Sequence, residues 1–362
     1  MWPDTRLIEL FDIEVPILLA PMAGPLTAEL GIAVAQAGGL GAFACTLLTP
    51  DEARRDLHAI RQKTARSFNV NFIVFSPPVP DAEREAAWKR ELAPYYAELG
   101  VDPTLPSNGA VRRPFDEAFC EVVEEFAPKV VSFHFGLPAQ RYVARIKRAG
   151  SKIISSATTV AEARWLEERG CDAIIAQGAE AGSHRGTFLG SGVESQAGTF
   201  ALVPQVVDAV KVPVIAAGGV ADARGITAAL ALGASGVQIG TAFLFCPEAR
   251  LSPLYRTALL SAQDDSTALT NVFSGRPARA IVNRIMREMG PIAPETPEFP
   301  LAANGLTPLA AAAEAKGAID FSSLWAGQAA SLGRVRPAGE LVRELAAETL
   351  ERLRSFHVSA GS

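Results

Sequence analysis

The feature that most constrains this chain is a series of eight short apolar runs in which polar and apolar residues do not alternate. The runs are residues 16–22, 41–45, 68–75, 130–136, 152–158, 173–178, 212–219 and 236–243. Continuous apolar strands are typical of parallel sheets that are buried on both faces. Helical patterns separate most of these runs, so the chain is predicted to be an α/β protein, a (β/α)8 or TIM barrel.

A recurring order of helix, glycine and strand supports this reading. Gly150 and Gly170 each lie between a helical pattern and an apolar run. Helix starts are marked by capping boxes at Thr49–Glu52 and Thr159–Glu162. Residues 30–50 and 225–247 carry no charge over the length of a membrane span, but glycines interrupt both. Each is predicted to be a buried helix followed by a strand, and no membrane partner is expected.

The remaining segments are predicted to be additions to the barrel. Residues 76–129 are too long for one crossover and are expected to hold an inserted helical segment within 81–99. Residues 1–246 then form the barrel, and residues 247–362 form a mostly helical C-terminal region near the active-site mouth. This region includes a proline-rich loop near 291–308.

Composition excludes several classes of function. The net charge is −5 and the basic residues are scattered, which argues against nucleic acid as a partner. The four cysteines form no CxxC pair, so neither a metal site nor a disulfide framework is expected. The N-terminus is charged and does not resemble a signal peptide, which favours a cytoplasmic location. The sequence leaves open whether the protein is a monomer or a homodimer.

Catalytic groups of TIM barrels lie on loops that follow the carboxyl ends of the strands. The residues at these positions here are mostly polar residues and glycines: Met22, Asn71, His134, Gln177, Gly182, His184, Gly218, Gly219, Gln238, Ile239, Gly240 and Thr241. The glycines after strands seven and eight match the usual phosphate site of such barrels. The buried amides need partners, which a heterocycle with carbonyl and N–H edges would supply. Together they predict flavin mononucleotide (FMN), although the glycines could instead serve only the turns.

Four longer stretches carry a family resemblance. They are APMAGPLTAELGIAVAQAGGLGAF, ISSATTVAEARWLEERGCDAIIAQGAEAGSHRG, VPVIAAGGVADARGITAALALGASGVQIGTAF and DFSSLWAGQ. Together they resemble the nitronate monooxygenases, formerly called 2-nitropropane dioxygenases, over residues 14–333. The resemblance implies non-covalent FMN and the oxidation of alkyl nitronates by dioxygen to a carbonyl compound and nitrite, without a metal. The LWAGQ motif and His134 in SFHFG look more like the nitronate-oxidising class than the related quinone-reductase class.

The resemblance also assigns residues. Met22, Asn71, Gln177, Gly182, Gly219 and the segment 238–241 match the family's FMN contacts, and His184 matches its active-site histidine. A histidine of near-neutral pKa can hydrogen-bond a nitro group or remove the α-proton of a neutral nitroalkane. The alternative for His184 is a solvated loop residue. His134 could line the substrate pocket or belong to the core, and Arg276 and Arg279 could reach an anion or only face solvent.

One stretch departs from the family. Residues 299–316 contain no tyrosine, and their only lysine is Lys316, whereas many relatives place tyrosines and a lysine there. The substrate pocket is therefore expected to be more apolar or more open, and propionate 3-nitronate need not be the substrate. Two other functions stay open: an NAD(P)H-dependent quinone or enoyl-thioester reductase, and a non-redox barrel that binds a phosphorylated ligand.

Overall fold

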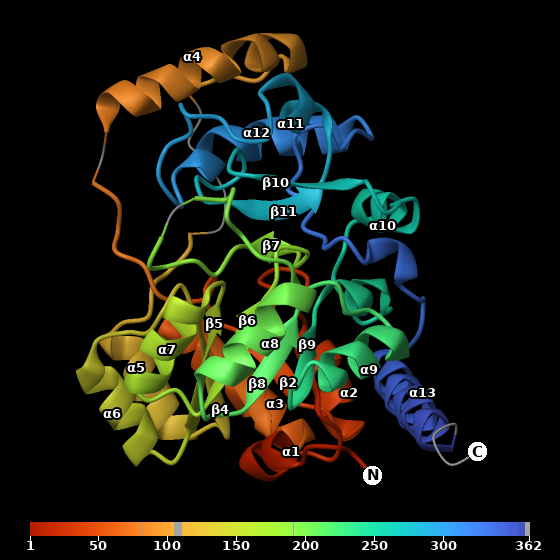
Figure 1. Ribbon diagram of the computed structural model, residues 1–362. Coiled ribbons are helices and arrows are strands. Elements are labelled where there is room, and N and C mark those ends of the chain that lie inside the picture. The colour runs from red at the N-terminus through yellow and green to blue at the C-terminus, as the bar shows by residue number, and fades with distance from the viewer. Residues whose placement is uncertain (80, 105–110, 191, 359–362) are drawn as a thin grey trace.

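The computed structural model describes residues 1–79, 81–104, 111–190 and 192–358. Eight parallel strands form a nearly closed barrel, which confirms the predicted fold class (Figure 1). Each predicted apolar run contains one of them: β1 (Ile17–Leu19), β2 (Gly41–Ala44), β3 (Phe68–Ile73), β4 (Val130–His134), β5 (Lys152–Ala157), β6 (Ala173–Gln177), β8 (Val214–Ala217) and β9 (Gly236–Ile239).

The barrel is closed between its first two strands by a single residue. Leu40 accepts a hydrogen bond from the Leu19 N–H and donates its own N–H to the Ile17 carbonyl, both at 3.0 Å. Helix α1 (Arg6–Phe11) supplies Leu7 and Phe11 to the apolar cluster inside the barrel, where both side chains are fully buried. Functional groups are therefore confined to the opposite end of the barrel.

Helices cover the outside of the barrel. They are α2 (Ala28–Gln36), α3 (Pro50–Lys63), α5 (Glu117–Phe126), α6 (Gln140–Arg148), α7 (Val160–Glu168), α8 (Thr199–Ala209) and α9 (Ala223–Ala231). After β9 the chain forms only a short 3-10 helix, Thr241–Phe245. The C-terminal helix α13 (Ala338–Val358) packs beside α2 and α9 and so takes the place of the eighth barrel helix (Figure 1).

The two uncharged segments of membrane-span length each form a helix and a strand of the barrel. Residues 30–50 contain most of α2 and all of β2, and residues 225–247 contain most of α9 and all of β9, as predicted. Within the described residues no helix is both long and apolar enough to cross a membrane.

The two predicted capping boxes differ. At Thr49 both reciprocal hydrogen bonds with Glu52 are present. At α7 the Thr159 hydroxyl caps the helix, but the buried Glu162 carboxylate turns to other partners. Its two oxygens accept the Thr158 N–H and hydroxyl, and the N–H groups of Phe188 and Leu189. Glu162 thus fastens the loop after β6 to the end of β5.

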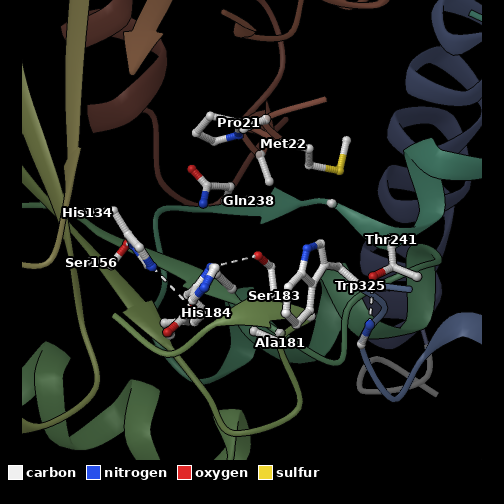
Figure 2. A pocket seen from close by; sticks show the side chains of 18 of the residues that line it. Pro21, Met22, His134, Ser156, Ala181, Ser183, His184, Gln238, Thr241 and Trp325 are labelled. Atoms are coloured by element: carbon white, nitrogen blue, oxygen red, sulfur yellow. Dashed lines mark hydrogen bonds between the residues drawn. The ribbon is translucent and has the colours of Figure 1, made fainter. Parts of the chain in front are cut away.

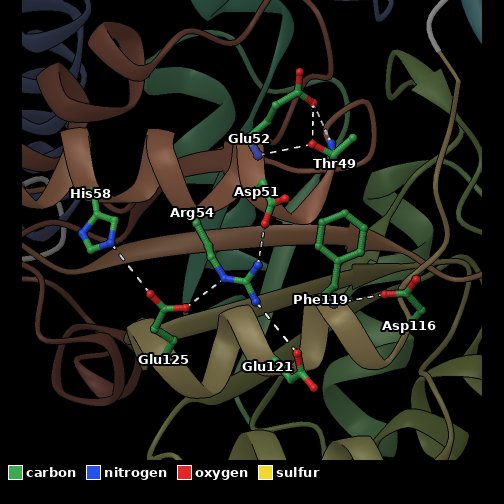
Figure 3. A network of polar contacts seen from close by, with 9 residues as sticks. All are labelled: Thr49, Asp51, Glu52, Arg54, His58, Asp116, Phe119, Glu121 and Glu125. Carbon is green, nitrogen blue, oxygen red and sulfur yellow. Dashed lines mark hydrogen bonds and ion pairs between the residues drawn. The ribbon is translucent and has the colours of Figure 1, made fainter.

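The acidic face of α5 is paired with its neighbour α3. Arg54 of α3 lies 3.0 Å from Glu125 and 3.9 Å from Glu121, and the exposed His58 lies 3.7 Å from Glu125 (Figure 3). Exposed ion pairs of this kind contribute little stability. This network therefore belongs to the polar outer surface of the barrel.

A second layer lies over the carboxyl ends of the strands (Figure 1). It contains a three-stranded sheet that the sequence did not predict, in the order β10–β11–β7. Its elements are α4 (Ala82–Leu99), β7 (Ser183–His184), α10 (Pro253–Leu260), β10 (Thr267–Thr270), β11 (Ala278–Ile281), α11 (Arg284–Glu288), α12 (Ala302–Ala315) and a 3-10 turn, Ala330–Leu332.

The inserted helix α4 packs on α12 in this layer. Tyr96 donates its hydroxyl to the Gly305 carbonyl at 2.7 Å, and Trp88 donates its indole N–H to the Ala302 carbonyl at 3.3 Å. A Cβ at Gly305 would lie 2.7 Å from Leu92 Cδ1 and 2.9 Å from Trp88 Nε1, so a larger residue there would displace these side chains. The insertion also includes residues 80 and 105–110, which lie outside the described residues.

Candidate active site

A cavity lies between the carboxyl ends of the barrel strands and the second layer. It is lined by all but one of the predicted site residues: Met22, Asn71, His134, Gln177, Gly182, His184, Gly218, Gly219, Gln238, Gly240 and Thr241. Ile239 is the exception, because its side chain is buried within β9. Figure 2 shows Pro21, Met22 and Gln238 along one side, with His134, Ser183 and His184 facing them.

One end of the cavity is built from glycine loops. Gly218 and Gly219, after β8, have φ of 105° and 70°, a region that favours glycine. Gly240, after β9, is close to Ala20, whose Cβ would lie 3.3 Å from an added Cβ. The carboxylate of Glu180 accepts the N–H and hydroxyl of Thr199 and so caps α8. Backbone at this end is therefore open to close approach by a ligand.

The amide side chains have different surroundings. Gln238 Oε1 is buried, and no described residue gives it a hydrogen bond. Asn71 Nδ2 donates to the carbonyl and hydroxyl of Ser132, which fixes the orientation of the amide. Gln177 donates to the His184 carbonyl at 3.0 Å and accepts the Gly186 N–H at 2.7 Å. The Gln177 amide thus holds the loop after β6, whereas Gln238 Oε1 remains a buried acceptor without a donor from the described residues.

Two further predicted residues contact the LWAGQ segment. A Cβ at Gly182 would lie 2.6 Å from the Gly327 N atom, so this glycine allows the two chain segments to touch. Thr241 Oγ1 accepts the Gly327 N–H at 2.9 Å, and the Gln328 N–H donates to the Glu180 carbonyl at 3.0 Å. The segment therefore closes one side of the cavity against the loop after β6.

His184 lies on the strand that joins the barrel to the second layer. In β7, His184 pairs with Ala278 of β11 and Ser183 pairs with Arg279. Ser183 has φ of 63°, which is uncommon for a non-glycine residue and is found at sites where the surroundings enforce it. His184 Nε2 lies 2.8 Å from the Ser274 hydroxyl, whereas Nδ1 lies 3.4 Å from Ser183 Oγ.

The surroundings of His184 keep its imidazole neutral. Its ring lies 5.3 Å from that of Trp325, 5.4 Å from Phe299 and 6.0 Å from Phe135. Burial lowers the pKa of His184 well below its usual value, and the nearby Arg112, His134 and Arg276 lower it further. The pKa of His184 therefore lies below the near-neutral value expected from the sequence, because the cavity is drier than a solvated loop. The neutral ring presents one nitrogen as a proton acceptor, although a weaker base than a solvated imidazole.

His134, at the end of β4, supports the main chain of His184. Its Nδ1 lies 3.1 Å from Ser156 Oγ, and its Nε2 lies 3.2 Å from the His184 carbonyl oxygen. Burial lowers the pKa of His134 to about 4, only partly offset by this backbone hydrogen bond. His134 both lines the cavity and holds the main chain of the loop that carries His184.

The two arginines considered from the sequence do not line the cavity. Arg276 stacks on Phe135 and donates to the Thr187 carbonyl, and Arg279 donates to the Ala179 carbonyl at 2.9 Å. Among the cavity residues that escaped the sequence reasoning are Phe135, Tyr255, Phe299 and Arg112. Tyr255, Phe299 and Arg112 follow no strand end and belong to no motif, whereas Phe135 lies within the predicted run 130–136, next to His134.

No group of three or more metal-binding side chains suited to a metal ion occurs among the residues that the structure describes. The stretch 299–316 contributes Phe299 to the cavity, whereas Lys316 is exposed and donates to the Leu99 carbonyl at 3.3 Å.

These features define a TIM-barrel enzyme with its site at the carboxyl ends of the strands. A family model described as nitronate monooxygenase matches residues 4–348. A nitronate monooxygenase from Paraburkholderia phytofirmans is 41% identical over 97% of each chain. The chain therefore belongs to the nitronate monooxygenase family, a family of flavoprotein oxidoreductases.

Solved structures agree with this assignment. A nitroalkane oxidase from Streptomyces ansochromogenes has a TM-score of 0.87 and 37% identity, covering 97% of this chain and 99% of that chain. FabK from Thermotoga maritima has a TM-score of 0.74 and 30% identity, covering 98% of both chains. The family and the first of these structures support oxidation of nitronates or nitroalkanes as the activity.

The lowered pKa of His134 predicts how stability depends on pH. The folded protein binds fewer protons at this residue than the unfolded chain between about pH 4 and 6.5, so stability falls on acidification through that range. Replacing His134 with Asn should make the loss between pH 7 and 5 smaller by about 1–2 kcal/mol. Urea unfolding at several pH values measures this. His58→Asn, at an exposed position of α3, should keep the parent slope, and an unchanged slope in His134→Asn would contradict the prediction.

Proposed function

We propose that this protein oxidises alkyl nitronates with dioxygen in an FMN-dependent reaction that yields a carbonyl compound and nitrite. The observation that carries the proposal is the neutral, ring-enclosed His184 at one side of a cavity with glycine loops at its end. Family membership supports the reaction class.

The cavity fits FMN at two points. The glycine loops at Gly218–Gly219 and Gly240 would hold the phosphate, because their backbone can approach an anion closely. The free Gln238 Oε1 would accept an N–H of the flavin ring, and Met22 lies on the same side of the cavity. When bound, FMN supplies the redox chemistry, and the protein supplies binding and orientation.

His184 would act differently on the two forms of a substrate. A nitronate has already lost its α-proton, so it needs only to be bound and oriented. A neutral nitroalkane must first lose that proton, which the neutral imidazole of His184 can accept. Nε2 lies 2.8 Å from the Ser274 hydroxyl and Nδ1 lies 3.4 Å from that of Ser183, so Nδ1 has the weaker partner and would be the nitrogen that takes the proton.

An anaerobic titration of the flavin spectrum tests the proposal. We expect the purified protein to be yellow, and an alkyl nitronate to bleach or shift its visible bands while NADH leaves them unchanged. Bleaching by NADH alone would make the protein a reductase of quinones or enoyl thioesters. A colourless protein that takes up no FMN would support the non-redox, phosphate-binding alternative.

His184→Asn separates the two roles of the histidine. The variant should retain FMN, because the loops proposed to bind the FMN phosphate, at Gly218–Gly219 and Gly240, do not include residue 184. Oxidation of neutral nitroalkanes should slow by about 10²–10⁴-fold, the usual contribution of a general base, and oxidation of nitronates by less than tenfold. Steady-state oxygen consumption measures both. An equal loss on the two substrates would argue against a role as base.

Gly219→Val tests the phosphate site. The added side chain should block the approach of the phosphate and release FMN, which is measured as flavin per protein after gel filtration. Gly317→Val is a matched control, since Gly317 has a similar positive φ of 80° and no atom within 4 Å of an added Cβ. It should share the backbone strain and remain yellow. A yellow Gly219→Val protein would show that the phosphate binds elsewhere.

A further inference from the structure

Arg112 is held at the cavity by the main chain that follows it. The Arg113 N–H donates to the Thr46 carbonyl at 2.8 Å, and the Phe115 N–H donates to the Ile73 carbonyl at 2.9 Å. Pro114 also forms a parallel bridge with Ile73 at the end of β3. Arg112 thus lies outside any helix or strand, yet its backbone is anchored to the barrel beside the cavity it lines.

The charge of Arg112 is not matched by a protein anion. Among the described residues, two side chains with a formal charge line the cavity, Arg112 and Glu180, and the Glu180 carboxylate accepts the N–H and hydroxyl of Thr199. No acidic group of the described residues forms an ion pair with Arg112, whose guanidinium lies 5.6 Å from the Phe299 ring centre. A partly buried cation without a counter-ion has lost hydration that a bound anion can replace.

The other arginines near His184 are occupied differently. Arg185 is buried and donates to the carbonyls of Gln177 and Gly178, and Arg276 and Arg279 donate to the main chain as described above. Their donors hold the loop after β6 and its neighbours together. Arg112 is therefore the arginine whose planar, two-pronged donor group is available to a ligand in the cavity.

Arg112 and His184 lie at the same end of the cavity. The Phe299 ring contacts both, at 5.6 Å from the Arg112 guanidinium and 5.4 Å from the His184 ring. The positive charge of Arg112 also helps to lower the pKa of His184. A substrate anion placed beside His184 thus meets a fixed cation and an uncharged imidazole.

We propose that Arg112 binds the negatively charged nitro group of the nitronate and thereby selects ionised nitronates over neutral nitroalkanes. This rests on the proposed function. A nitronate spreads its charge over two oxygens in one plane, which suits paired N–H donors of a guanidinium. A neutral nitroalkane offers the same oxygens with little charge and gains much less from the contact.

Arg112→Gln tests the assignment, with Arg113→Gln as the matched control. Arg113 is the adjacent residue, has an exposed side chain, and loses the same charge on substitution. For the nitronate of 1-nitropropane, Arg112→Gln should raise KM about 10- to 100-fold with kcat changed less than threefold. KM for neutral 1-nitropropane should change less than threefold. Arg112→Lys should recover part of the loss, and Arg113→Gln should behave as the parent.

Nitrate gives a readout that does not require turnover. Titrated against the flavin spectrum, this planar anion should bind Arg112→Gln about 10- to 100-fold more weakly than the parent or Arg113→Gln. Equal nitrate affinity in all three proteins, or equal losses for nitronate and nitroalkane, would overturn the role of Arg112. A parent protein that shows Arg112-dependent nitrate binding but oxidises no nitronate would instead overturn the proposed function and leave the anion site standing.

Discussion

The contact between the loop after β6 and the C-terminal part of the chain determines the rest of the site. Ser183 and His184 leave the barrel and become a strand of the upper sheet by pairing with β11. Gly182 and Gly327 allow the two segments to touch, because a side chain on either would collide with main-chain atoms. The loop is thus held from above by the sheet and from below by Gln177, His134 and Glu162.

The electrostatics of the site follow from this closure. Covering the barrel mouth with Trp325 and Phe299 removes water from around His184, which favours its neutral form. The nearby carboxylates of Glu180 and Glu162 keep their charge and are stabilised by main-chain N–H donors. The cavity therefore combines an uncharged imidazole and a free cation, Arg112, which suits an anionic substrate better than a neutral one.

Much of the barrel was predictable because local pattern and fold agree there. The eight apolar runs each contain a strand, since a parallel strand covered on both faces must be apolar throughout. The strand-end rule also found eleven of the residues that line the cavity, because parallel strands bring their carboxyl ends together. The rule failed for Arg112 and Phe299, which follow no strand and reach the cavity through the insertion and the chain before α12. The capping box at Thr159 was half right, since the Glu162 carboxylate accepts hydrogen bonds from the adjacent Thr158 and from Phe188 instead.

The sequence by itself determined the barrel, the end of it that carries the site, and the candidate histidine, since these depend on periodicity and on the order of elements along the chain. Tertiary structure alone decided the hydrogen-bond partners of Gln177 and Thr241, the neutral state of His184 and the placement of Arg112. Tertiary structure also decided that the sheet β10–β11–β7 forms and that α13 packs where an eighth barrel helix would lie. All of these depend on contacts between segments up to hundreds of residues apart, and no local pattern records which distant segment will be the neighbour.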